Sequence, residues 1–133
     1  MSATAGPDSS GGDASAVDAR VWAVSKGDAN ADAYEDAAHV RAEAWPVRAA
    51  VADGATESAF AGAWATMLVN GLVDVDAMTE SAFASAVADG QRAWQSAVGE
   101  NEHEAPWYVT AKVAEGAYAT ALGLSVQPDG MWQ

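Results

Sequence analysis

Hydrophobic side chains recur at helical spacing in two stretches of the chain, each opened by a phenylalanine. The first set is Phe60, Trp64, Met67 and Leu68, and the second is Phe83, Val87, Trp94 and Val98. Intervals of three, four and seven residues place such side chains on one side of an α-helix. The pattern therefore predicts two amphipathic helices that each bury one face.

The starts of these two helices share an octet that differs at one position. TESAFAGA spans 56–63 and TESAFASA spans 79–86. In each copy Thr is a candidate N-cap, and the following Glu meets the positive end of the helix dipole. The segments diverge after the octet and no third copy appears, whereas solenoids need about three repeats to bury a continuous core. We interpret the octets as one capping motif used twice.

Further helices are predicted on both sides of this pair. They span 31–45, which ends because Pro46 disfavours helical geometry before it, 46–53, which ends at Gly54, and 107–123, which ends at Gly123. The last carries Trp107, Ala111, Ala114, Tyr118 and Leu122 on one face. The sequence thus predicts an all-α protein, a single small domain of about four to five helices.

The remaining segments are predicted to be irregular. They are the connector 72–78, the acidic loop 99–106, the turn QPDG at 127–130 and an apolar end, 131–133, that either docks or protrudes. Apart from Met1, residues 1–16 have no large apolar side chain, so we expect a disordered tail before a domain of 17–133. The apolar patch 17–24 is either a helical turn or an arm lying on another surface.

Charge and composition exclude several classes of partner. The formal net charge is -13, and no basic stripe is present that would neutralise a phosphate backbone or an anionic membrane. No segment has the pattern of a signal peptide or a membrane span, so we expect a cytoplasmic protein. Such acidity fits a protein that works in high salt, and a high-GC source gives similar Ala and Asp enrichment.

Candidate metal ligands are few. The chain has no Cys, so thiolate sites are excluded, and no nucleophile elbow or phosphate-binding loop is present. Asp36 and His39, like Glu100 and His103, have the spacing of a helical carboxylate–His metal motif. The second pair lies between Gly99 and a proline, in a stretch that we do not expect to be helical. We therefore predict no metal on this chain.

The tryptophans are the other candidates. Ala dominates the apolar residues and Ile is absent, so six Trp exceed what a small core needs. Either some of them anchor an interface, with Trp45 and Trp107 beside prolines as the candidates, or all lie in or at the edge of the core.

Three segments together resemble the helical part of nitrile hydratase beta subunits, and of the related thiocyanate hydrolase subunits and nitrile hydratase activators. They are AFAGAWATMLVNGLV (59–73), TESAFASAV (79–87) and WYVTAKVAEGAYATALG (107–123). The likeness covers at most residues 45–130, and the barrel half of a beta subunit is missing. Where the family usually has Trp-Glu-x-Arg, residues 55–58 read Ala-Thr-Glu-Ser, and a Trp-x-x-Arg lies upstream at Trp45 to Arg48.

The resemblance implies a non-metal-binding subunit of a heteromeric lyase that hydrates a nitrile to an amide and is not catalytic alone. Co(III) or Fe(III) would lie on a Cys-bearing alpha-type partner, with a further barrel subunit. Arg48 and Tyr108 would act at that centre. The pocket or interface residues would be Trp45, Trp107, Phe60 and Trp64. Two alternatives are a non-catalytic adaptor or metallochaperone-like activator, and a stand-alone acidic helical protein.

Overall fold

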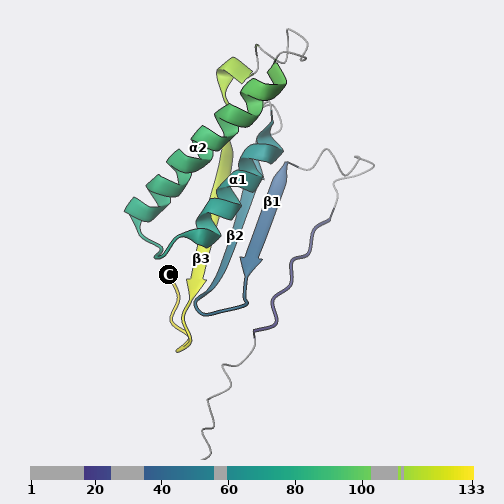
Figure 1. Ribbon diagram of the computed structural model, residues 1–133. Coiled ribbons are helices and arrows are strands. Elements are labelled where there is room, and N and C mark those ends of the chain that lie inside the picture. Colours follow the sequence, from purple (N-terminus) through teal and green to yellow (C-terminus); the bar gives the residue numbers. More distant parts are fainter. Residues whose placement is uncertain (1–16, 25–34, 56–59, 103–110, 112) are drawn as a thin grey trace, which may run out of the picture.

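The protein is a two-layer α/β domain. The computed structural model describes residues 17–24, 35–55, 60–102, 111 and 113–133. In these ranges the elements are β1 (Asp36–Arg41), β2 (Val47–Gly54), α1 (Ala61–Asp74), α2 (Glu80–Glu102) and β3 (Ala119–Val126). The strands form one antiparallel sheet with β2 in the centre. Figure 1 shows both helices on the same side of the sheet, where α1 packs on all three strands and α2 packs on α1. The all-α prediction is therefore wrong.

Three predicted helices contain strands. The range 31–45 includes β1, 46–53 coincides with β2 apart from its ends, and the last residues of 107–123 begin β3. Residues 111 and 113–115 of the last range are helical, as predicted. These segments look helical because they are rich in Ala, the residue with the highest helix propensity. Pairing along the full length of β2 outweighs that preference, because both of its edges are hydrogen-bonded to a neighbouring strand.

The sheet contributes small residues to the core, and α1 contributes the large ones. From β2, Ala50, Ala52 and Gly54 face α1, while the largest fully buried side chains, Leu72, Val69 and Val73, all belong to α1. A Cβ on Gly54 would lie 2.5 Å from the carbonyl oxygen of Glu35 and 3.0 Å from that of Ala61. The backbones of sheet and helix thus approach too closely at this end for a side chain to fit between them.

The two central helices are confirmed, but their ends differ from the prediction. Thr79 caps α2 as predicted, since its hydroxyl oxygen accepts a hydrogen bond of 3.2 Å from the amide of Ala82. Helix α1 begins only at Ala61, after Phe60 in a left-handed conformation (φ 57) without a side-chain cap. Thr56 itself lies outside the described residues.

Helix α2 runs further than the acidic loop predicted for 99–106 allows, since it continues through Glu102. Its contact with α1 is close because small residues lie where the helices meet. A Cβ on Gly90 would lie 3.3 Å from the ring of the buried Trp64, and one on Gly71 would lie 3.5 Å from Ala86 Cβ. Within the described residues, neither α1 nor α2 has the length and apolar character that a membrane crossing requires.

The segments outside the helices and strands are an N-terminal arm and a C-terminal tail. The arm, Val17–Val24, has neither helix nor ladder hydrogen bonds, and the side chain of Trp22 is 83% exposed. The predicted turn at 127–130 is confirmed by the hydrogen bond from Gly130 N to Gln127 O. After it, the tail, residues 131–133, docks on β3 through two backbone hydrogen bonds between Ser125 and Gln133. The predicted disordered segment, 1–16, lies outside the described residues.

Candidate functional site

The site residues predicted from the sequence lie in different parts of the domain. Arg48 is on β2, near the end of α1, whereas Phe60 immediately precedes α1. The fourteen residues of α1 separate them by about 20 Å at 1.5 Å per residue. Trp64 is buried between the helices, and Trp45 is half-buried in the turn that joins β1 to β2. Trp107 and Tyr108 lie outside the described residues. The roles that the resemblance implies for these residues stay predictions.

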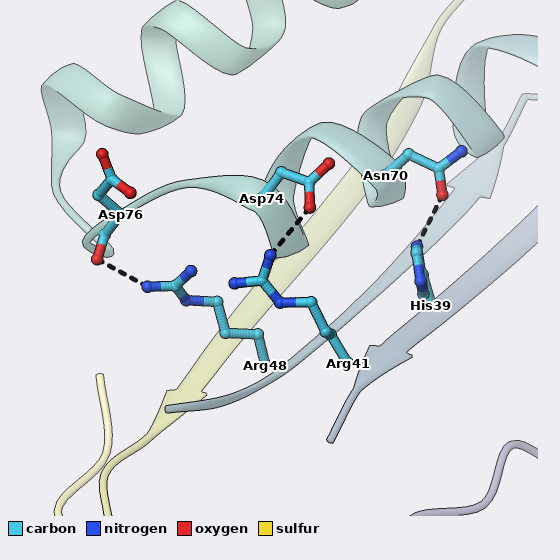
Figure 2. Close-up of polar contacts among 6 residues, drawn as sticks. All are labelled: His39, Arg41, Arg48, Asn70, Asp74 and Asp76. Carbon is cyan, nitrogen blue, oxygen red and sulfur yellow. Dashed lines mark hydrogen bonds and ion pairs between the residues drawn. The ribbon is translucent and has the colours of Figure 1, made fainter. Parts of the chain in front are cut away.

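A row of polar contacts joins the sheet to α1 and the turn after it (Figure 2). His39 Nδ1 lies 2.7 Å from Asn70 Oδ1, Arg41 pairs with Asp74 at 3.1 Å, and Arg48 Nη2 donates to the carbonyl oxygen of Asp76 at 2.6 Å. The sheet residues of the row share one face because His39 and Arg41 are two positions apart on β1 and Arg41 is directly opposite Arg48. The row therefore follows one side of α1 to its C-terminal end.

Arg48 is the buried cation of this row. Its side chain is 4% exposed, and its guanidinium binds a backbone carbonyl instead of a carboxylate. The Nε atom is buried and has no hydrogen-bond partner among the described residues. A cation is favourable near the C-terminal end of a helix, where the carbonyl groups make the local potential negative. In this position Arg48 holds the α1–α2 turn against the sheet.

His39 contributes an imidazole to the row. Its Nδ1 shares a hydrogen bond with the side-chain amide of Asn70. The hydrogen bonds of the described residues bring neither a hydroxyl nor a carboxylate to this ring. Asp36, three positions earlier on β1, points to the opposite face of the sheet, because strand residues alternate. The helical metal motif suggested by that spacing is therefore not formed.

No group of three possible metal-ligating side chains occurs among the residues that the structure describes. The polar row thus has the geometry of a clamp between layers: one exposed ion pair, one His–Asn hydrogen bond and one buried Arg on a backbone carbonyl.

Among the described residues no helix lies over the other face of the sheet, and the middle of that face is apolar. Register pairs Val51 with Leu122 and Ala49 with Leu124, so these four side chains lie together on the face opposite α1. We call this the open face. Leu122 is 69% exposed and Val51 is 52% exposed. The chain has only four leucines, and two of them are here, while Leu68 and Leu72 fill the core.

The open face continues onto the tail at one end. Trp132 pairs with Val126 across an antiparallel bridge, and directly opposite residues of such a pair project to the same side. Trp132 therefore lies on the open face, where its side chain is 73% exposed. Met131, its neighbour along the extended tail, projects to the other side.

A hollow of about 660 Å³ lies at the other end of the open face. The arm lines it with Val21 to Val24, and the sheet lines it with 36–38, 51–53 and 120–122. Asp36 and Asp53, which are opposite each other in the register, place carboxylates at this end. The hollow thus combines apolar walls with an acidic rim, and its volume is in the range of ligand-sized pockets.

Sequence reasoning missed Leu122, Leu124 and Trp132 as functional candidates. A signal was present, because Thr120, Leu122, Leu124 and Val126 alternate with Ala, Gly and Ser. That period of two is typical of a strand. The predicted helix ended at Gly123, in the middle of this alternating segment, so the segment was not recognised as one strand.

The three segments that carry the nitrile hydratase resemblance differ in outcome. The first two correspond to α1 and to the start of α2, whereas 119–123 of the third lies in β3. The relationship itself stays a prediction. Comparison with protein-family models, with curated proteins and with solved structures finds no match for this chain.

Proposed function

We propose that this domain is a non-catalytic association module that binds another protein chain through the open face of its sheet. The observation that carries the proposal is the exposure of Leu122 and Leu124, two of four leucines in the chain, beside Val51 and Trp132. Contiguous apolar surface of this kind marks interaction sites on small soluble domains. The cytoplasmic location expected from the sequence is part of this proposal.

Energetics favour an apolar contact there. Burying a large apolar side chain contributes roughly 1.5–3 kcal/mol when it leaves water. The sheet already orders the backbone that carries Val51, Leu122 and Leu124, so little backbone conformational entropy remains to be lost on binding. The sheet side chains of the polar row, by contrast, already form hydrogen bonds within the domain.

The test is the size of the native assembly that contains this chain. We expect the wild type to run in an assembly larger than its own 13.6 kDa. A Leu122→Thr/Leu124→Thr double variant, which places β-branched residues that favour a strand at both positions, should run at the monomer mass with an unchanged circular dichroism spectrum. The control is Phe83→Thr, an exposed apolar residue on α2. A wild type that is monomeric in its native extract contradicts the proposal, as does a double variant that keeps the assembly.

The resemblance implies a more specific partner, namely the other subunits of a nitrile hydratase-type enzyme. It requires that the assembly also contain a Cys-bearing chain with cobalt or iron. Metal analysis and mass spectrometry of the purified assembly test this requirement. An assembly without such a chain excludes the hydratase subunit and leaves the association module in place.

A further inference from the structure

We propose that the open face is completed by a second copy of this chain, in a two-fold dimer in which Trp132 of each copy fills the hollow of the other. The proposal deepens the association function above and rests on it, because it names the partner of the same face. It follows from four features: where the hollow and Trp132 lie, the extent of the face, its charges, and the hydrogen-bonding capacity of the hollow's rim.

The hollow and Trp132 lie at opposite ends of one surface. The hollow is centred on the part of the sheet where Val51 pairs with Leu122 and Asp53 pairs with Thr120. Trp132 lies beyond Val126, at the far end of β3. A two-fold axis that runs between two stacked sheets, parallel to both and at right angles to the line from the hollow to Trp132, turns the open faces toward each other and exchanges the two ends. It therefore places each Trp132 over the other copy's hollow, and a closed, self-complementary interface results.

The register also gives the position of the axis. Leu124 is two residues from Leu122 and two residues from Val126, so it lies about midway between the hollow and Trp132. In the dimer each Leu124 then meets Leu124 of the other copy. Such a self-contact occurs only at the axis of an isologous interface, which makes this position diagnostic.

The extent of the face suits a stable dimer. Strands of eight residues are roughly 26 Å long, and four segments about 4.8 Å apart, counting the tail, are roughly 19 Å wide. With side chains standing out from it, such a surface is of the order of the roughly 800 Å² that each partner buries in a standard interface. Two sheets packed face to face about 10 Å apart form a sandwich with side chains interdigitated.

The charges of the open face are compatible with a second copy despite the net charge of -13. Asp36 and Asp53 lie at one end of the face, so the two-fold axis keeps the two acidic ends apart, at opposite ends of the interface. They also lie at the rim that receives Trp132. The indole N–H is a donor and a carboxylate is an acceptor, so the rim can satisfy the polar atom of the incoming ring. The repulsion that remains is long-range and is screened by salt.

The experiment is sedimentation equilibrium of the purified full-length chain at low and at high KCl. We expect a dimer whose dissociation constant falls as salt rises. Trp132→Ala should weaken association by about 30-fold or more, the effect of removing a buried aromatic anchor. Its matched control is Met131→Ala, which removes an equally exposed neighbour on the other side of the tail and should leave association unchanged. Because Trp132 is mostly exposed in the single chain, its replacement should leave the melting temperature nearly unchanged when both proteins are measured at a concentration low enough for the wild type to be monomeric.

A second measurement tests the axis. The natural chain has no cysteine, so a single Leu124→Cys can be joined by a short bis-maleimide without background. We expect it to give a covalent dimer in high yield, whereas Ala84→Cys, on an exposed position of α2, should give little.

Three results would overturn the dimer: a purified wild type that stays monomeric at every concentration and salt tested, equal association of the Trp132 and Met131 variants, or equal cross-linking at positions 124 and 84. If the purified chain is monomeric but the native assembly still depends on Leu122 and Leu124, the occupant is another protein and the association function stands. If neither depends on these residues, both proposals fail.

Discussion

Replacing Gly54 by Ala tests the closest approach between the layers of this domain. The added Cβ would lie 2.5 Å from Glu35 O and 3.0 Å from Ala61 O, and both atoms are backbone. Neither can rotate away as a side chain would, so the start of β1 or of α1 must shift. The amide of Gly54 also donates to Glu35 O at 3.1 Å, and the shift strains this hydrogen bond. Overpacking of this kind costs about 1–3 kcal/mol.

The matched control is Gly99→Ala on α2, where an added Cβ meets nothing within 4 Å. There the substitution removes the entropic cost of a helical glycine and should stabilise the domain by about 0.5–1 kcal/mol. Urea denaturation followed by circular dichroism measures the free energy of unfolding of both variants. In thermal melts their melting temperatures should move in opposite directions, by roughly 4 °C for each kcal/mol. If Gly54→Ala is neutral or stabilising, the sheet and α1 are not in backbone contact at this end, and the account of the small-residue core is wrong.

Four further substitutions, at three positions, and one metal analysis test other parts of the structure. Arg48→Met should change the free energy of unfolding by less than about 1 kcal/mol, because it keeps an apolar stem in place of the buried one and removes a buried charge that has no carboxylate partner among the described residues. Arg48→Ala, which also removes the stem, should cost about 2 kcal/mol or more. Trp64→Ala should cost about 3–5 kcal/mol in the same urea titration, since the ring packs between α1 and α2; a smaller loss would mean that the helices close over the space. Asp74→Asn should cost less than about 1 kcal/mol, because its ion pair with Arg41 is exposed. A larger loss would mean that this ion pair stabilises the domain more than an exposed pair can. The isolated chain should keep no stoichiometric cobalt, iron or zinc after dialysis, and metal that survives dialysis and is measured by elemental analysis would contradict this.

The two helices were predictable from the sequence because their information is local. Phe83, Val87, Trp94 and Val98 mark one side of α2 at helical spacing, and Thr79 supplies the cap that begins it. The turn at 127–130 was predictable for the same reason, since Pro and Gly constrain the backbone over a few residues. The absence of Cys and the net charge likewise limit the chemistry and the partners before any fold is known.

The sheet was decided by tertiary structure. Taken alone, β2 is an Ala-rich segment that ends in Gly, and its helical propensity is high. It becomes a strand because β1, just before it in the sequence, and β3, from a distant part of the sequence, pair with its two edges, and because α1 fills the layer above its small side chains. The strand signal was weak because the positions facing the core are small, so polarity did not alternate along β2.

The candidate interface depends even more on the fold. In the sequence, Leu122 and Leu124 cannot be distinguished from the core leucines. They are exposed because both helices lie on the other side of the sheet. Trp132 joins them only through its pairing with Val126. The sequence shows which residues are hydrophobic and are therefore stabilised by burial. The arrangement of the layers decides which of them the chain itself buries and which stay exposed and available to a partner.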